Sequence, residues 1–390
     1  MISFSNIATA VVAVASTLVG HVNGQSCPPS GSRDTTSGGF EYTYPFPIQY
    51  AQIETQGQKL CQAYMDVSPG DYEHTSASDF NGETIVLLHG KNFCGATWEE
   101  SINVLVSEGY RVIVPDQIGF CKSDKPENYA WSLHQLALNT KTILEKAIPS
   151  LAEDGDAVAE DDSSNHDDDD DDDDDDGDDC SASSSTITVM GHSLGGMLAA
   201  RFTIMYPSIV SRLVMVNPVG LEDWKAKGVP YRPIEESYEQ EASSNYTNIR
   251  GYEQRTYYLG DWRPEYDTWV YMLLELYNGS LGDLYAWIQA KIVDMVYTQP
   301  VIYEFPLIGK TGTTKTLLVV GEQDTTAIGA IWSPPEVREK LGNYEVLGKE
   351  AVELIGDNAT LLNYPELGHS PHISNPDMFH EDLLEWLGDA

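Results

Sequence analysis

Apolar runs without polar alternation recur along the chain. The first covers residues 84–88 and ends at His89-Gly90. Such runs are typical of parallel strands that helices cover on both faces. Helical patterns over residues 98–107 and 133–148 separate the first runs, which predicts a mostly parallel sheet with right-handed crossovers. Further runs of this kind cover residues 111–114, 187–190, 213–216 and 316–320, and residues 360–363 are predicted to form a short strand.

The region before the first run has a different pattern. Residues 25–43 are rich in Ser, Gly, Pro and Thr, which predicts a flexible segment with ordered structure from about Tyr44 onward. Residues 48–55 and 59–65 have the composition of strands and are separated by Gln56-Gly57-Gln58. This arrangement predicts a β-hairpin.

Two long segments interrupt the strand–helix alternation. Residues 152–184 are acidic and Ser-rich, and the repulsion of like charges predicts a disordered surface insertion. Residues 221–310 are dense in Tyr and Trp and contain helical patterns. We expect them to form a helical cap over the edge where the carboxyl ends of the strands meet, because ligand sites form at that edge. The core then consists of residues 44–220 and 311–390.

The charge is strongly negative, with 61 Asp and Glu against 22 Lys and Arg, and a formal net charge of −39. Residues 153–179 carry 18 of these acidic side chains, and subtracting them leaves −21. This balance disfavours a nucleic-acid partner and an anionic membrane surface. The unbroken run from Asp167 to Asp176 offers hard oxygen ligands, so weak association with divalent cations stays open, although the run lacks the turned spacing of a calcium loop.

The first residues suggest export. Residues 7–19 are apolar and are followed by Val22-Asn23-Gly24, with small residues at the last and third-last positions, which predicts a signal peptide over residues 1–24 and a secreted protein. A buried strand or an anchor is the alternative, because no Lys or Arg precedes the apolar stretch. Sequons that fit export and N-glycosylation begin at Asn245, Asn278 and Asn358.

The cysteines allow at most two internal disulfides and leave one residue over. Their spacing does not resemble a zinc site, so we expect no bound metal. The pairing is open at this point. The residues are Cys27, Cys61, Cys94, Cys121 and Cys180.

A nucleophile motif follows the run at residues 187–190. The sequence Gly191-His192-Ser193-Leu194-Gly195 matches G-x-S-x-G, and a helical pattern follows it directly. A sharp strand-to-helix turn needs small residues on both sides of the serine, and Gly191 and Gly195 meet that need. We therefore expect Ser193 to be the nucleophile, and we interpret His192 as a packing residue that points away from it.

A serine hydroxyl needs a histidine base, which an acid orients. The order for this strand–turn–helix motif is serine, acid, histidine. Asp324 follows the run at 316–320, and His369 follows the short run at 360–363, so these two are the predicted partners. Glu322 is the alternative acid and His372 is the alternative base.

An oxyanion hole needs two N–H donors. One should be the backbone N–H of Leu194, directly after the nucleophile. The other should come from the loop after residues 84–88, from Lys91 or alternatively from Asn92. The Lys91 side chain either binds a substrate carboxylate or points to solvent.

Together these features resemble the α/β-hydrolase superfamily over most of residues 44–387. The resemblance implies an eight-stranded, mostly parallel sheet with helices on both faces and a helical cap inserted after the sixth strand. Within the superfamily, the chain is similar to the capped branch that includes meta-cleavage-product hydrolases, haloalkane dehalogenases and epoxide hydrolases. The features that carry the resemblance are His89-Gly90 with Trp98, residues 115–120 with Lys122-Ser123, and residues 191–196, 321–324 and 368–369.

One departure from the family pattern is Cys121, which stands where glycine is usual. Cys94 and Cys121 follow neighbouring strand ends. A disulfide between them would stiffen the loops that face the substrate.

The chemistry separates members of this branch. Haloalkane dehalogenases and epoxide hydrolases use a carboxylate nucleophile, because water opens their alkyl-enzyme ester at the enzyme's own carbonyl. Ser193 cannot form that intermediate. The expectation is therefore a secreted serine hydrolase, without a cofactor, that acts on a small ester, lactone, thioester or activated carbon–carbon bond.

Two alternatives remain, a cofactor-free perhydrolase and a non-catalytic extracellular protein that binds a ligand or cations. The substrate pocket is expected to be of moderate size and aromatic. Its candidate residues are Phe93, Trp224, Tyr258, Trp262 and Trp269.

Overall fold

A computed structural model describes residues 26–72, 75–153, 186–310 and 313–390. The predicted signal peptide, the acidic run and Cys180 lie outside these ranges. The core of the described chain is an eight-stranded sheet with the order β1-β2-β4-β3-β5-β6-β7-β8. The strands are β1 Ile48–Thr55, β2 Gln58–Val67, β3 Thr84–Leu88, β4 Arg111–Pro115, β5 Ile187–His192, β6 Val210–Val216, β7 Lys315–Gly321 and β8 Ala359–Tyr364.

The sheet confirms the predicted architecture. β1 and β2 form the expected antiparallel hairpin, and β2 pairs antiparallel with β4, while all other pairs are parallel. The side chains of β3 and β5 are buried along their whole length. Complete burial explains why these runs lack polar alternation, since both of their faces are covered.

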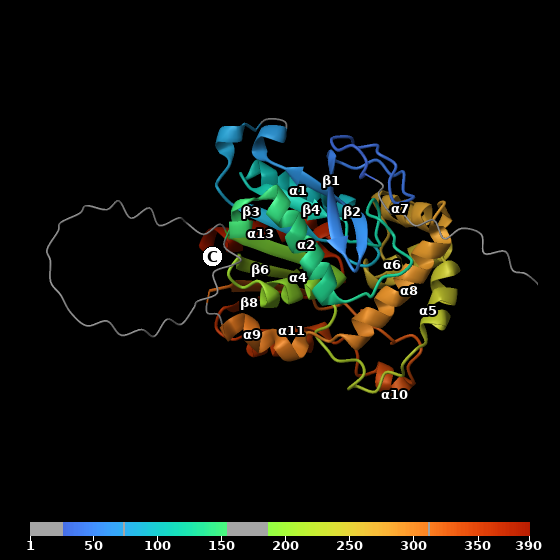
Figure 1. The fold of residues 1–390 in the computed structure, drawn as a ribbon. Coiled ribbons are helices and arrows are strands. Elements are labelled where there is room, and N and C mark those ends of the chain that lie inside the picture. The colour runs from blue at the N-terminus through green and yellow to red at the C-terminus, as the bar shows by residue number, and fades with distance from the viewer. Residues whose placement is uncertain (1–25, 73–74, 154–185, 311–312) are drawn as a thin grey trace, which may run out of the picture.

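Helices cover both faces of the sheet (Figure 1). α2, α4, α9 and α11 pack in succession on one face, and α1 packs against α13 on the other. No helix within the described ranges is long and apolar enough to span a bilayer. The helices are α1 Glu99–Ser107, α2 Leu133–Ala147, α3 Ser150–Glu153, α4 Leu194–Met205, α5 Ile234–Ala242, α6 Tyr246–Thr256, α7 Asp267–Asn278, α8 Gly282–Thr298, α9 Phe305–Lys310, α10 Pro335–Arg338, α11 Tyr344–Ile355, α12 Pro371–Ser374 and α13 Pro376–Asp389.

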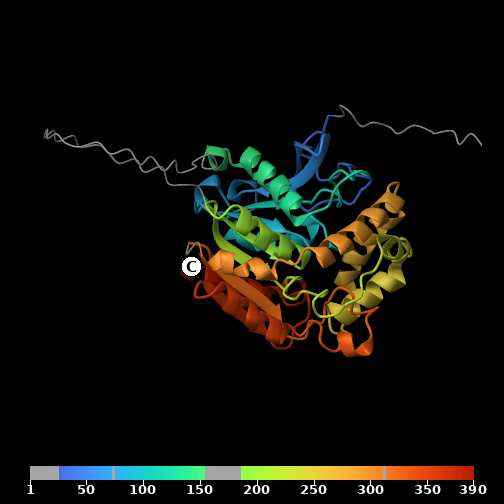
Figure 2. The ribbon, with the colours of Figure 1, turned by 60° about the horizontal axis from the view of Figure 1, so that its bottom comes forward.

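The segment between β6 and β7 contains the cap. α5, α6, α7 and α8 gather at one end of the molecule, away from the helices that flank the sheet (Figure 2). The expected cap, residues 221–310, extends too far, because α9 packs against α4 and α11 of the core. Ile308 of α9 is fully buried in the main hydrophobic cluster, so this helix completes the core before β7.

The N-terminal segment is the clearest correction to the sequence-based expectation. Residues 26–43 were expected to be flexible, yet Cys27 forms a disulfide with Cys61 of β2. Phe40 is completely buried. The ammonium group of Lys122 donates to the carbonyl oxygen of Thr35 over 2.7 Å and lies over the Phe40 ring. A covalent bond and a buried aromatic anchor thus order a segment whose composition alone indicates a loop.

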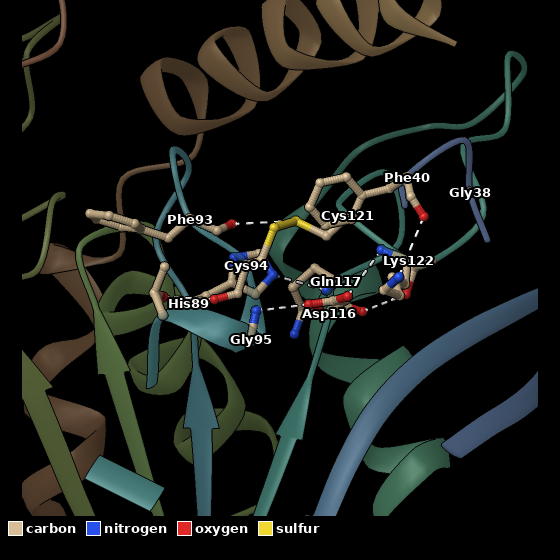
Figure 3. The surroundings of a disulfide bond; sticks show 12 residues. Gly38, Phe40, His89, Phe93, Cys94, Gly95, Asp116, Gln117, Cys121 and Lys122 are labelled. Atoms are coloured by element: carbon tan, nitrogen blue, oxygen red, sulfur yellow. Dashed lines mark hydrogen bonds between the residues drawn. A yellow bond between two sulfur atoms is a disulfide. The ribbon is translucent and has the colours of Figure 1, made fainter. Parts of the chain in front are cut away.

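A second disulfide joins Cys94 to Cys121, and so ties the loop after β3 to the loop after β4 (Figure 3). Asp116 supports the same junction, because its carboxylate accepts hydrogen bonds from the backbone N–H groups of Gly95 and Lys122, over 2.8 and 3.0 Å. Cys121 has a φ of 44°, a left-handed conformation that glycine adopts at little cost. Cys121, which stands where the family pattern usually has glycine, thus adopts a backbone conformation that favours glycine.

The predicted glycosylation positions lie at the surface of the described chain. Asn245 and Asn278 are exposed, and Asn358 is partly exposed. Asn245 also caps α6, since its side-chain oxygen accepts from the Asn248 N–H over 3.1 Å.

Candidate active site

The predicted nucleophile, Ser193, lies in the turn between β5 and α4. Its φ of 56° and ψ of −118° are a strained combination for a residue with a side chain. The glycines around it are required by close packing. A Cβ on Gly191 would lie 2.0 Å from the Gly195 carbonyl oxygen, and a Cβ on Gly195 would lie 2.0 Å from that of Leu88. The turn places the serine at the amino end of α4, where the helix dipole favours negative charge.

Asp324 and His369 follow β7 and β8, at the same edge of the sheet as Ser193. Nδ1 of His369 lies 2.7 Å from Oδ2 of Asp324, and both side chains are buried. The backbone N–H of Thr326 donates to the other carboxylate oxygen over 2.8 Å. These contacts fix the orientation of the imidazole ring and leave Nε2 as the nitrogen that can take a proton.

The contact between Ser193 and His369 is not made in this conformation. Nε2 of His369 is buried and has no hydrogen-bond partner within the described ranges. The His369 ring lies against that of His192, the residue before the serine, with centroids 4.8 Å apart. Proton transfer would require Nε2 and the Ser193 hydroxyl to approach to about 3 Å.

The alternative base occupies a different environment. His372 is buried with its ring centroid 4.7 Å from that of Trp98, and desolvation lowers its pKa to about 3. The carboxylate of Asp324 bonds to His369 and not to His372. The alternative acid, Glu322, is partly exposed and its carboxylate forms no hydrogen bond among the described residues.

His192 is a packing residue, but it does not point away from the site as expected. Its Nε2 lies 2.8 Å from the backbone oxygen of His369, and its ring lies between those of His369 and His372. Burial holds the pKa of His192 well below its usual value. A neutral ring therefore supports the loop that carries His369.

The loop after β3 approaches the nucleophile closely. A Cβ on Gly90 would lie 3.2 Å from that of Ser193. His89 anchors this loop, since its Nε2 accepts from the Gln117 N–H over 3.0 Å (Figure 3). Its Nδ1 donates to the Gly90 carbonyl over 2.8 Å. The predicted oxyanion donors, the backbone N–H groups of Leu194, Lys91 and Asn92, have no acceptor among the described residues.

The side chains of the same loop connect it to the cap. The Lys91 ammonium group lies 2.8 Å from the Glu241 carboxylate of α5, so it neither points to solvent nor stands free for a substrate carboxylate. The Asn92 amide donates to the hydroxyl of Tyr257 over 2.8 Å. The position of this loop and the position of the cap are therefore coupled.

An aromatic cluster from the cap lies over His369. Tyr257 stacks on the His369 ring with centroids 5.0 Å apart and lies 5.6 Å from the Phe93 ring. Trp224 is not part of this cluster; it lies in the main core and its indole donates to Glu222 over 3.0 Å. The other predicted pocket residues do belong to the cluster, which consists of Phe93, Tyr257, Tyr258 and Tyr266, with Tyr252, Trp262, Trp269 and Ile373 packed against it.

The candidate site is closed in this conformation. Ser193 is 8% exposed and His369 is 1% exposed. Two cavities lie elsewhere. One of about 600 Å³ is at the amino ends of β3 to β7, and one of about 510 Å³ lies between α6 and Gln323.

Known proteins with a similar sequence or structure share this architecture. A model of the alpha/beta hydrolase fold matches residues 83–246. A probable hydrolytic enzyme of known crystal structure from Pseudomonas aeruginosa is 42% identical, with 91% of this chain and 99% of the other covered and a TM-score of 0.76. The chain belongs to the alpha/beta hydrolase family. Its sequence and its fold agree on this point.

Curated relatives of this alpha/beta hydrolase match over shorter stretches. A haloalkane dehalogenase from Mycobacterium marinum is 33% identical over 30% of this chain and 42% of its own length. A cis-3-alkyl-4-alkyloxetan-2-one decarboxylase from Xanthomonas campestris is 27% identical over 45% of this chain and 50% of its own length. The hydrolase thus spans half or less of these relatives.

Asn217 is a site residue of this hydrolase that the sequence interpretation missed. Its amide donates to Oδ2 of Asp324 over 3.0 Å, and its side-chain oxygen accepts from the Gly321 N–H over 3.1 Å. It is completely buried and has a φ of 39°. A signal was present, because Asn217 directly follows the buried run at residues 213–216, at the edge where ligand sites form.

Proposed function

We propose that the chain is a serine hydrolase in which Ser193, His369 and Asp324 form a catalytic triad and the reaction passes through an acyl-enzyme. The observation that carries the proposal is the 2.7 Å contact between His369 and Asp324, beside a serine in a strained turn. Strain of this kind persists only where the surroundings enforce it, and it is concentrated at functional sites.

The proposed mechanism has two half-reactions, formation of the acyl-enzyme and its hydrolysis, and the same residues act in both. His369 takes the Ser193 proton through Nε2, and the serine oxygen attacks the carbonyl carbon of the substrate. Asp324 stabilises the imidazolium. The leaving group departs with a proton from His369, and a water activated by the same nitrogen then hydrolyses the acyl-enzyme. The N–H groups of Leu194 and of Lys91 or Asn92 are the proposed donors to the oxyanion.

The proposed substrate is a small ester, lactone, thioester or activated carbon–carbon bond with an apolar or aromatic acyl group. The aromatic cluster supports an apolar acyl pocket. The printed name of the Xanthomonas relative specifies an oxetan-2-one, which is a cyclic ester. The similarity to a haloalkane dehalogenase does not extend to its chemistry, because that reaction needs a carboxylate at the position of Ser193.

We also propose that the protein is secreted. The disulfides between Cys27 and Cys61 and between Cys94 and Cys121 support this, since such bonds persist in oxidising compartments. Residues 1–24 would be its signal peptide. A mature protein that begins after Gly24 in the culture medium would support the proposal, and retention of the intact chain inside cells would contradict it.

The alternatives raised by the sequence provide matched controls for the triad. Hydrolysis of p-nitrophenyl butyrate would be measured for Ser193→Ala, His369→Gln and Asp324→Asn. Each should lose at least about a thousandfold in kcat, as removal of triad members does in serine hydrolases. The corresponding controls, His372→Gln and Glu322→Gln, should stay within a few-fold of the wild type.

Folding of each variant would be checked by its urea unfolding midpoint. Full activity of Ser193→Ala would refute the proposed nucleophile. Loss of activity in His372→Gln with retention in His369→Gln would transfer the role of base to the other histidine. Reaction of a fluorophosphonate probe with the wild type but not with Ser193→Ala would exclude a protein that has lost catalysis.

A further inference from the structure

Glu253 is a buried acid in the cap. It lies on α6 and is 1% exposed. Neither carboxylate oxygen has a hydrogen-bond partner within the described part of the chain. Two neighbouring polar groups share this condition, namely the hydroxyl of Tyr258 and the indole N–H of Trp262. Tyr258 and Trp262 are in edge contact, with ring centroids 5.7 Å apart.

This polar group lies close to the proposed base. Glu253 and Tyr257 are four residues apart, which places them on the same face of the helix end. Tyr257 stacks on His369, and a Cβ on Gly368 would lie 2.7 Å from the Tyr257 carbonyl oxygen. The end of α6 therefore packs directly on the loop that carries His369, and the face with Glu253 borders the aromatic cluster.

A buried polar group without a partner is costly, so its presence calls for an explanation. An apolar side chain would fill the position without that cost. Burial raises the pKa of Glu253 to about 8, so the carboxyl group is neutral at pH 7 and can donate a hydrogen bond. Together with the Tyr258 hydroxyl and the Trp262 N–H, it provides donors within the aromatic cluster, where the guanidinium groups of Arg250 and Arg263 lie over the rings of Trp262 and Tyr266. An oxygen atom that accepts hydrogen bonds would satisfy them.

We propose that Glu253, Tyr258 and Trp262 form the polar end of the acyl pocket and select acyl groups that carry a keto oxygen beyond the scissile carbonyl. The inference rests on the proposed function, because it assigns the substrate of the same site. It adds a hydrogen-bonding requirement to the apolar pocket. Glu253 acts here as a specificity residue and takes no part in the proton transfers.

Two pairs of esters test the selection. The first is p-nitrophenyl 4-oxopentanoate against p-nitrophenyl pentanoate, and the second is the 5-oxohexanoate against the hexanoate. The ratio of kcat/KM within each pair would be measured for the wild type, Glu253→Gln and Glu253→Leu. The ratio cancels effects common to both esters, including any change in the triad.

The wild type should prefer the oxo ester in at least one pair by about tenfold, the value of one good hydrogen bond. Glu253→Leu should lose this preference, so that the kcat/KM ratio within that pair falls to about one. Glu253→Gln should keep most of the preference, because its amide still donates. Circular dichroism and urea midpoints would establish that the variants are folded.

Each other outcome has a distinct meaning. No hydrolysis of any ester by the wild type would refute the proposed function. Hydrolysis without a preference in either pair, or an equal loss on both esters in Glu253→Leu, would refute the selection while leaving the function intact.

A pH series keeps the test valid if Glu253→Leu fails to fold. The wild-type preference should fall between pH 7 and 9 as the carboxyl ionises, and Glu253→Gln should show no such fall. The titratable groups coupled to Glu253 are Tyr252, Tyr257 and Tyr258, and the pKa of each is raised, so they stay neutral in this range. A preference that changes equally in both proteins would overturn the proposal.

Discussion

The buried carboxyl of Glu253 makes a prediction about stability that is independent of any substrate. Replacement by glutamine keeps the shape of the side chain and removes its ionisation. The pKa of Glu253 is raised from 4.5 to about 8 by burial alone. The unfolded chain therefore releases its proton at a lower pH than the folded chain does, and ionisation stabilises the unfolded state from about pH 4.5 upward.

The size of the effect follows from linkage. Each pH unit between 4.5 and 8 lowers the wild-type free energy of unfolding by about 1.4 kcal/mol through this group. At pH 7 the deficit is about 3 kcal/mol, and at pH 4 it is close to zero. Glu253→Gln should therefore gain about 3 kcal/mol relative to the wild type between pH 4 and pH 7.

Urea unfolding followed by tryptophan fluorescence at pH 4, 5.5 and 7 would measure this gain. Glu239→Gln on α5 is a matched control, because Glu239 is exposed and forms no ion pair within the described ranges. The difference in free energy of unfolding between Glu239→Gln and the wild type should not change with pH. The reasoning would be refuted if Glu253→Gln differed from the wild type by the same amount at pH 4 and pH 7.

Three further predictions concern other parts of the molecule. Asn217→Ala removes a hydrogen bond to the Asp324 carboxylate, so it should lower the free energy of unfolding by about 3 kcal/mol and kcat by at least about tenfold; an unchanged kcat on p-nitrophenyl butyrate would contradict its positioning role. Loss of the second disulfide in Cys94→Ala/Cys121→Gly should cost about 3.5 kcal/mol in urea. Cys94→Ala/Cys121→Ala should be about 1 kcal/mol less stable still, because alanine is strained at a φ of 44°; equal midpoints would refute that reason. Deletion of residues 161–179 should leave kcat unchanged, since the described chain resumes at the amino end of β5 and Ser193 follows its carboxyl end; a collapse of turnover would contradict this.

The sheet could be predicted because its buried strands correspond to continuous apolar runs in the sequence. Residues 84–88 form β3 without any shift in bounds, since complete burial requires an unbroken apolar run. Composition could not predict that residues 26–43 adopt a defined structure. Cys27 bonds to a residue 34 positions away, and composition does not record such long-range partners. The same holds for α9, whose place in the core depends on contacts with α4 and α11.

In the candidate site, too, some residues could be predicted from the sequence and others could not. Asp324 and His369 could be paired in advance because the order of motifs and the parallel topology bring the ends of β7 and β8 together. Asn217 could have been found by the same reasoning, since it too follows a buried run. Glu253 could not, because a single acid on a helix gives no sign of whether it faces solvent or an aromatic cluster.

The disulfide between Cys94 and Cys121 gives the core side of the site a covalent restraint that the cap side, which contains no cysteine, lacks. It joins the loops after β3 and β4, so the core side of the site cannot spread apart. The cap side is held to it by weaker contacts, among them the ion pair of Lys91 with Glu241. Ser193 is 8% exposed beneath these contacts. Reduction of the disulfide would remove this restraint from the core side and leave the ion pair of Lys91 with Glu241 in place, so the substrate loops are held differently in the oxidised and the reduced protein.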